Sequence, residues 1–426
     1  MQHESHIAGE MASSVPSYRV ADPARLRECV HCGLCLNACP TYVELGTEMD
    51  SPRGRIYLIR GLEDGSVALD DEVVRHLDLC LGCRGCETAC PSGVQYGSII
   101  EDARAYIERA SSRPWWEKLR RAAILNVFPY RARMRALLGL AQVARGLGLW
   151  PLVTRFVEGA ALLPPLRSGA SLAEIHPARG RERARVGLLR GCVADVLFAE
   201  VNAAAVRVLT HYGVTVVVPP GQGCCGALHL HNGAPEAARQ LARRNLLAFP
   251  DDLDAVVVTA AGCGSAMKEY AHLLSDDLSG ARARQFAGRV RDVTEFLAEL
   301  EAPAPARALH LRATYHDACH LAHGQGVRAA PRRLLSAIPG LELVEMGEAD
   351  MCCGSAGSYN LTEPDMAQRL RERKIGHIVA SGAECVVVGN PGCALQIRAG
   401  LAARGANVRV AHPVELLDQA YADTPS

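Results

Sequence analysis

The sequence predicts a chain of mixed class, in which a helical N-terminal domain precedes a duplicated α/β unit. Three observations support this prediction. Two cysteine runs of identical spacing lie within the first 100 residues, two later segments repeat each other at offsets of 127 to 130 residues, and both segments alternate short apolar strands with helices. At 426 residues, the chain is long enough for several domains.

The composition is that of an ordinary globular protein, with 49% hydrophobic and 22% charged residues. Its 46 basic and 46 acidic residues cancel, which argues against a general nucleic-acid binder. The stretch from Met1 to Ser17 is polar, so we expect no signal peptide, and no apolar run reaches the length of a membrane span. We therefore expect a cytoplasmic protein, whose 17 cysteines indicate metal binding rather than disulfides.

The two cysteine runs share the pattern C-x2-C-x2-C-x3-C-P. This pattern is typical of bacterial iron–sulfur proteins, in which three thiolates of one run hold a 4Fe–4S cluster together with the last cysteine of the other run. A zinc ribbon would instead use two separate C-x2-C pairs. We therefore predict two 4Fe–4S clusters, the first held by Cys29, Cys32, Cys35 and Cys90, and the second by Cys80, Cys83, Cys86 and Cys39.

The residues between the two runs predict a helical domain of ferredoxin type. Residues 51–60 and 70–79 have helical patterning, with a turn expected at 61–66. Such a spacer is far longer than a minimal ferredoxin needs. Arg53 and Arg55 lie in the first helix, and we interpret each as a capping or solvated side chain rather than one that tunes a cluster.

A basic segment follows the cysteine runs. Residues 113–190 contain 15 basic and 4 acidic residues, and Trp115 and Trp116 lie near its start. A basic amphipathic helix edged by tryptophan can bind an anionic membrane or an acidic partner, which would make the protein peripheral on the inner face of the cytoplasmic membrane. A helical hairpin packed on the cluster domain would carry the same charges on a solvated face, so the sequence leaves both interpretations open.

The second half is an internal duplication whose cysteines match. In each copy one cysteine follows the first strand, a Cys-Cys-Gly (CCG) loop follows the second, and a further cysteine follows the last. Parallel sheets bind ligands at the carboxyl ends of their strands. We therefore predict a metal site in each copy, formed by Cys192, Cys224, Cys225 and Cys263 in the first and by Cys319, Cys352, Cys353 and Cys393 in the second. Cys385 matches Ala255 of the first copy, so we expect a buried strand thiol.

Each copy predicts the same order of elements: strand, helix, strand, helix and strand. They lie at 185–189, 194–212, 214–218, 235–248 and 255–259 in the first copy, and at 313–316, 330–338, 341–345, 364–381 and 385–388 in the second. The glycine-rich loops of both copies lack dinucleotide or Walker spacing, which excludes nucleotide binding. The chain then divides into a flexible terminus, a two-cluster domain, a connector and two CCG domains, at 1–20, 21–112, 113–184, 185–305 and 306–426.

This combination of motifs resembles the iron–sulfur subunits of 2-hydroxyacid and glycerol-phosphate dehydrogenases and of heterodisulfide reductases. Within that group the chain is most similar to glycolate oxidase iron–sulfur subunits, through residues 51–59, 223–227 and 352–359 and the Gly-Cys pairs at Cys263 and Cys393. The resemblance implies an oxidoreductase complex whose separate flavin subunit oxidises glycolate to glyoxylate. This chain would pass the electrons toward the quinone pool, and a second accessory subunit could complete the complex.

The sequence departs from the fullest CCG pattern of that group, which closes with C-x-x-C and has five cysteines. Each copy here has four, enough for one cubane or a zinc ion, and metal-free sites also stay open. A histidine could supply a further ligand, although a hydrogen-bonded core or surface role is commoner for any single histidine. The candidates are His231, His316, His320 and His323.

Three functions are therefore compared. In the first, the chain is an electron-transfer subunit without catalytic residues of its own. In the second, the CCG half itself reduces a quinone or a disulfide, although the missing fifth cysteines argue against disulfide chemistry. In the third, the chain is a scaffold whose CCG cysteines bind zinc or nothing. Substrate reduction by the isolated chain separates the second function from the others, and metal content separates the first from the third.

Overall fold

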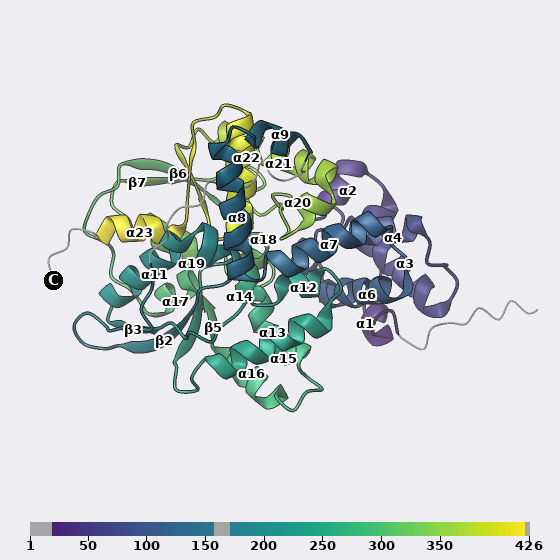
Figure 1. Cartoon of the computed structure of the whole chain (residues 1–426), viewed down its shortest axis with the longest axis horizontal. Coiled ribbons are helices and arrows are strands. Elements are labelled where there is room, and N and C mark those ends of the chain that lie inside the picture. Colours follow the sequence, from purple (N-terminus) through teal and green to yellow (C-terminus); the bar gives the residue numbers. More distant parts are fainter. Residues whose placement is uncertain (1–18, 157–170, 422–426) are drawn as a thin grey trace, which may run out of the picture.

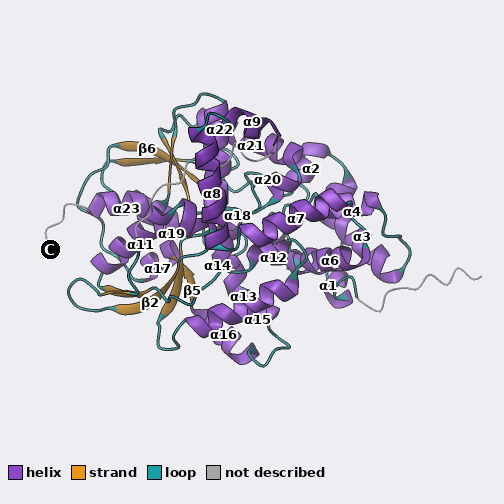
Figure 2. Ribbon diagram, viewed as in Figure 1, coloured by secondary structure: helices purple, strands orange, loops and turns teal. Residues whose placement is uncertain are grey.

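The structure is a computed structural model that describes residues 19–156 and 171–421. Most of the predicted flexible terminus, residues 1–18, lies outside the described residues. The N-terminal helices lie at one end of the molecule and two sheets lie at the other, with the long helices α7 (Trp115–Val127) and α8 (Arg131–Gly146) between them (Figure 1). The mixed class predicted from the sequence is confirmed (Figure 2).

Short helices build the N-terminal part around one apolar cluster, whose fully buried members include Ile59, Leu77 and Ile99. Each cysteine run lies in the loops and first turns between these helices. The helices therefore position the loops, and the thiols do not line one face of a helix. The elements are α1 (Pro23–Arg27), α2 (Pro40–Leu45), the short 3-10 helix η1 (Glu48–Asp50), α3 (Pro52–Asp64), α4 (Asp71–Asp78), α5 (Gly85–Thr88) and α6 (Tyr96–Ala110).

The two helices expected between the cysteine runs are α3 and α4. The Ser51 side chain accepts the Gly54 N–H at 3.0 Å and begins α3, and Asp70 accepts the Val73 N–H at 2.8 Å and begins α4. The turn expected at 61–66 begins only at Gly65, because α3 continues to Asp64. Gly61 is a helical residue packed under Val67, whose Cγ2 would lie 2.4 Å from any added Cβ. A close approach therefore explains this glycine better than a turn does.

The predicted connector contains α7, α8 and α9 (Trp150–Phe156). Met134 and Leu138 of α8 are buried against Val196 of the first CCG copy. The opposite side of α8 is exposed and apolar, with Leu140 69% and Leu147 68% accessible. Across residues 19–156 and 171–421, no helix combines the length and apolarity that a membrane crossing requires.

The first CCG copy forms a mainly parallel sheet in the order β1-β3-β2-β4-β5. Strand β2 pairs in parallel with β3 and β4, as the all-apolar strands predicted, whereas the short β1 pairs antiparallel with β3 and was not predicted. The strands are β1 (Ile175–His176), β2 (Ala184–Leu189), β3 (Val214–Val217), β4 (Ala255–Val258) and β5 (Val290–Asp292). The helices are α10 (Val193–Leu197), α11 (Ala199–His211), α12 (Ala227–His231), α13 (Pro235–Ala248), α14 (Ala261–Lys268), α15 (Tyr270–Leu273), α16 (Gly280–Arg289) and α17 (Val293–Glu299).

The second copy repeats this plan with an all-parallel sheet in the order β7-β6-β8-β9. In the first copy, the single helix expected at 194–212 is instead two helices, α10 and α11. Phe198 leaves the helical conformation between them, and its ring is buried. The strands are β6 (Leu311–His316), β7 (Leu341–Val344), β8 (Cys385–Val388) and β9 (Arg409–Ala411). The helices are α18 (Cys319–Ala322), α19 (Ala329–Ser336), α20 (Tyr359–Thr362), α21 (Pro364–Ala380), α22 (Pro391–Ala403) and α23 (Pro413–Tyr421).

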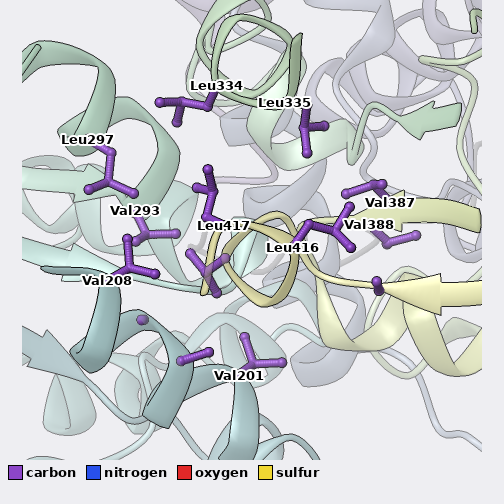
Figure 3. Close-up of a cluster of buried hydrophobic side chains, with 14 of the residues drawn as sticks. Val201, Val208, Val293, Leu297, Leu334, Leu335, Val387, Val388, Leu416 and Leu417 are labelled. Carbon is purple, nitrogen blue, oxygen red and sulfur yellow. The ribbon is translucent and has the colours of Figure 1, made fainter. Parts of the chain in front are cut away.

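The two copies share one hydrophobic core. Figure 3 shows Val208 and Leu297 of the first copy in the same cluster as Leu335, Val387 and Leu417 of the second. Both copies therefore bury apolar faces against each other. An ion pair between Arg207 and Asp418, 2.7 Å apart, closes the edge of the contact between α11 and α23.

The carboxyl ends of the central strands meet across this seam. The Ala261 N–H, just after β4, donates to the Gly389 carbonyl, just after β8, at 3.1 Å. The next residue, Gly262, donates its N–H to the Asn390 side chain at 3.2 Å. The strand ends that carry the predicted metal sites therefore face each other.

Candidate metal centres

The first cysteine run forms a loop between α1 and α2. Gly33 has a φ of +86°, and an added Cβ would lie 2.7 Å from Nη1 of Arg53. Glycine therefore lets the guanidinium of Arg53 cross the loop and donate to the His31 carbonyl at 3.1 Å. Of the four predicted ligands of the first 4Fe–4S cluster, three pack against the apolar core of the N-terminal helices: Cys29, Cys35 and Cys90. The fourth, Cys32, is exposed. Burial raises the pKa of the Cys35 thiol to about 11, although the Arg53 backbone N–H opposes this shift.

The four predicted ligands of the second cluster line one cavity: Cys39, Cys80, Cys83 and Cys86. The Gly82 N–H donates to Cys80 Sγ at 3.3 Å, and the Tyr96 hydroxyl donates to the same sulfur at 3.7 Å. Burial raises the pKa of Cys83 and Cys86 well above the usual thiol value, so ligation has to displace their protons. Four thiols around one cavity, with N–H and O–H donors to sulfur, fit the needs of a 4Fe–4S cluster.

A buried guanidinium lies beside this cavity. Arg55 of α3 is 1% exposed, and its Nη1 lies 3.9 Å from Cys39 Sγ. Its Nε donates to the His76 carbonyl at 2.7 Å, and its Nη2 lies 3.5 Å from the Asp50 carboxylate. Our interpretation of Arg55 as a solvated side chain is therefore wrong.

The charge of Arg55 acts on the thiols. Burial by itself would raise the pKa of Cys80, but the cations of Arg55 and Arg104, together with the hydrogen bonds from Gly82 and Tyr96, lower it overall. Burial also disfavours the charged form of Arg55, yet the surrounding thiol, phenol and carboxyl groups raise its pKa overall. The chain thus supplies a fixed positive charge where a thiolate-bound cluster would place negative charge.

The first CCG site is a chain of sulfur contacts at the ends of β2, β3 and β4. Its members are Cys192, Cys224, Cys225 and Cys263. The Sγ atoms of Cys192 and Cys224 are 3.4 Å apart, and thiol hydrogen bonds from Cys224 and Cys263 lower the pKa of Cys225 well below the usual value. Asn245 and Tyr270 hold the loop, donating to the Cys224 and Cys225 carbonyls at 3.0 and 2.7 Å.

The second CCG site repeats the contacts between Cys319, Cys352, Cys353 and Cys393. Asn390 Nδ2 donates to Cys393 Sγ at 3.4 Å. Lys374 replaces Asn245 of the first copy and is 2% exposed, with Nζ donating to the Glu348 and Ala349 carbonyls. Burial lowers the pKa of Lys374, and the nearby thiols oppose that shift. A buried ammonium near Cys352, Cys353 and Cys393 suits a site whose occupied form is anionic.

One cavity connects the two CCG sites across the seam between the copies. Its wall includes both predicted cysteine sets apart from Cys353: Cys192, Cys224, Cys225, Cys263, Cys319, Cys352 and Cys393. Ile124 and Phe128 of the connector close one side, and Leu228 and Leu361 add further apolar wall. The duplication has therefore produced a shared, largely apolar chamber between two cysteine clusters.

The second CCG site also adjoins the second N-terminal cavity. Leu79 and Leu81 pack in one apolar cluster with Cys319 and Cys352, and Cys83 packs against it. The imidazole Nε2 of His320 lies 3.1 Å from the Gly82 carbonyl in the loop of the second cysteine run. The thiol groups of the N-terminal part and of the duplicated part thus form a continuous series.

All four histidines considered as ligands have a hydrogen-bond partner within the chain, and for His316 the partner is the Ala349 carbonyl, 3.2 Å from Nδ1. His231 Nδ1 lies 2.8 Å from Glu101, His320 contacts Gly82, and His323 Nε2 lies 3.2 Å from the Asp350 carbonyl. The fourth, His316, is completely buried. The expected strand thiol Cys385 is confirmed, since it lies in β8, is fully buried, and has a pKa raised by burial to about 11.

Sequence reasoning missed Arg55 and Lys374 as charges beside thiols. A weak signal existed for Lys374, because it is one of only three lysines in an arginine-rich chain. No sequence signal placed Ile124 and Phe128 of the connector at the shared cavity, because that contact depends on how the connector packs. The assignment of particular cysteines to particular clusters stays a prediction.

Comparison with known proteins agrees with this architecture. A model of a 4Fe-4S dicluster domain matches residues 25–94, and a model of a cysteine-rich (CCG) domain matches residues 186–268 and again 313–398. A solved hypothetical protein from Helicobacter pylori covers 88% of this chain, and the chain covers 68% of it, with a TM-score of 0.53 and 9% identity, which shows the fold alone. The fold and the cysteine sites define an iron–sulfur protein made of a dicluster domain and paired CCG domains.

The relatives are more specific. The chain is 38% identical over 422 residues to the "Probable glycolate oxidase iron-sulfur subunit" of Bacillus subtilis (strain 168), which covers 94% of this chain and 95% of that protein. It is 37% identical over 406 residues to the "Glycolate oxidase iron-sulfur subunit" of Escherichia coli (strain K12), covering 93% and 94%. The chain therefore belongs to the family of glycolate oxidase iron–sulfur subunits, which are subunits of an oxidoreductase complex.

Proposed function

We propose that this chain is the electron-transfer subunit of a flavin-dependent 2-hydroxyacid dehydrogenase complex. Glycolate is the substrate, a partner flavin subunit oxidises it to glyoxylate, and this chain carries the electrons toward the quinone pool. Its family supports the choice of glycolate. The observation that carries the proposal is the continuous series of thiol sites from the first cysteine run to the first CCG copy.

The residues of the chain divide the work as follows. A 4Fe–4S cluster, when bound, accepts and releases one electron at a time. The first set, Cys29, Cys32, Cys35 and Cys90, and the second set, Cys80, Cys83, Cys86 and Cys39, are the ligands we propose for the two clusters. Arg55 and the backbone N–H groups at sulfur set the charge balance of the second site. In this proposal the chain supplies no acid or base.

The exposed apolar side of α8 is evidence for a surface that binds a partner subunit. Ala132, Ala136, Leu140, Val143 and Leu147 follow one another at helical spacing and are all exposed. A contiguous row of exposed apolar side chains indicates a surface that is covered by a partner rather than by solvent. We assign it to docking of the flavin subunit, and binding of vesicles by the isolated chain would instead favour a peripheral position on a membrane.

The shared cavity favours a second candidate function, in which quinone is reduced between the two CCG sites. Its largely apolar wall, which includes Ile124 and Phe128, suits a flat apolar ring, and cysteines of both copies face it. Disulfide reduction is less well supported, because each copy has four cysteines in place of five. Quinone reduction by the isolated chain with an artificial electron donor would favour this candidate.

The proposed function is tested on the complex with its flavin subunit, purified without oxygen. Cys35→Ser should remove one N-terminal cluster and abolish glycolate-dependent quinone reduction, while glycolate still reduces the flavin of the partner. Quinone reduction that persisted undiminished would refute the electron path. Iron, acid-labile sulfide and zinc per chain separate this function from a zinc-bound scaffold, since two cubanes require about eight irons.

A further inference from the structure

One imidazole in the duplicated half has a nitrogen without a partner. His316 ends strand β6 and is completely buried. Its Nδ1 lies 3.2 Å from the Ala349 carbonyl, which accepts the Nδ1 proton and leaves the Nε2 lone pair free. Nε2 is buried and has no hydrogen-bond partner. A buried polar atom of this kind requires an explanation.

This imidazole faces the second CCG site. A ring nitrogen of His316 and the sulfur atoms of Cys353 and Cys393 all lie within 4.8 Å of one another, and all three residues are buried. Since Nδ1 is engaged by Ala349, Nε2 is the nitrogen available to a metal. A carbonyl that fixes the other ring nitrogen is the usual support of a metal-bound histidine.

Among the described residues, the other imidazole nitrogens without a partner do not lie in such a group with two cysteine sulfur atoms. His176 and His229 also have a buried nitrogen without a partner. Within residues 19–156 and 171–421, however, the group around His316 is the one place where ligand atoms of three or more His, Cys, Asp or Glu side chains all lie within 4.8 Å of one another. In the first copy, Leu189 occupies the position of His316 at the end of β2, so this feature belongs to the second copy alone.

We propose that His316 Nε2 is a metal ligand at the second CCG site, together with the thiolates of Cys319, Cys352, Cys353 and Cys393. The imidazole takes the place of the fifth thiolate that this chain lacks. Imidazole and thiolate are common ligands of both iron–sulfur centres and zinc, so the ligand class is a thiolate-bound iron or zinc centre. The first CCG site lacks this ligand, so its four thiols are not part of the proposed centre.

The difference has a chemical consequence. A neutral imidazole in place of a thiolate removes one negative charge from the site, and the buried ammonium of Lys374 reduces the charge further. In iron–sulfur centres, replacement of cysteine by histidine raises the reduction potential. An iron centre at the second copy is therefore easier to reduce than one held by five thiolates.

The test uses the full chain, purified without oxygen, and measures iron, sulfide and zinc per chain together with alkylation of Cys353 and Cys393. His316→Leu copies the natural Leu189 of the first copy. It should lose the metal of the second CCG site, about four irons or about one zinc, and expose both cysteines to alkylation. The matched control is His377→Leu on α21, a half-buried imidazole paired with Glu348 at 3.3 Å, and this variant should keep its metal.

His316→Cys keeps the proposal testable if His316→Leu does not fold. A thiolate at this position should retain the metal and protect Cys353 and Cys393 as in the wild type. A wild-type chain with about eight irons and no zinc would overturn the proposal. So would a folded His316→Leu variant whose metal content and alkylation match the wild type, or a His316→Cys variant that lacks the metal.

Discussion

Replacement of Arg55 by methionine should lower the reduction potential of the second N-terminal cluster. The guanidinium is a fixed positive charge beside Cys39 and Cys80, and it favours the reduced cluster, which carries one more negative charge. Methionine fills a similar volume without the charge. The potential of the first cluster should change much less, because Arg55 lies at the cavity of the second.

The magnitude follows from the geometry. With 3.9 Å between Arg55 Nη1 and Cys39 Sγ, the interaction of two unit charges at an effective dielectric constant of about 20 is about 4 kcal/mol. The added electron spreads over a cluster whose centre is farther away, so we expect about half of this, roughly 2 kcal/mol. At 59 mV per 1.4 kcal/mol for one electron, the expected decrease is about 80 mV.

The assay is an anaerobic redox titration of the full chain followed by electron paramagnetic resonance. Arg60→Met is the matched control, because Arg60 lies on the same helix with its side chain exposed, and its loss should move either potential by less than about 20 mV. Loss of Arg55 also leaves the buried Asp50 with one partner fewer, so Arg55→Lys tests folding while retaining a cation. An Arg55→Met chain with about eight irons and unchanged potentials would refute the reasoning.

Three further variants test other parts of the structure. Leu140→Glu on the exposed side of α8 should weaken binding of the flavin subunit at least about tenfold in pull-down titrations at unchanged iron content, and unchanged binding would exclude that surface. Burial lowers the pKa of His412 to about 4, below the ordinary 6.5, so the unfolded chain binds the proton more tightly. This imidazole alone should then lower the free energy of unfolding by about 2 kcal/mol between pH 7 and pH 5, and urea titrations should find a smaller fall in His412→Gln. Lys374→Met should release metal from the second CCG site to a chelator about tenfold faster than wild type, whereas equal rates would contradict the role of the ammonium.

Most of the fold was predictable because its signals are local. Strands β4 and β8 are uninterrupted apolar runs ending in three valines, and they have the bounds expected to within one residue. The spacing of the cysteine runs is equally local, and so the two-cluster domain was predictable from the sequence. By contrast, β5 and β9 span three residues each and carry Arg291 and Arg409, so no apolar run marks them.

The charged groups and hydrogen-bond partners around the thiols could not be predicted from the sequence, because they depend on tertiary packing. Arg55 has the same helical surroundings in sequence as the exposed Arg60, and only the packing of α3 on η1 and α4 buries one and exposes the other. The same holds for His316. The sequence offered four histidines near cysteines, and the structure distinguishes them by the partners of their ring nitrogens.

Duplication explains why the cysteines of two domains serve one chamber. Each copy places its thiols at the carboxyl ends of its strands, and the shared core turns these ends toward each other, as the contact from Ala261 to Gly389 demonstrates. Two identical sites would have the same reduction potential, so they would not favour electron flow in either direction. The lysine Lys374 in place of Asn245 makes the second site less negative, His316 in place of Leu189 adds a ligand to it, and this site adjoins the N-terminal clusters. The copies have therefore diverged at the positions that set the charge around each sulfur group, while their strands and cysteines have stayed alike.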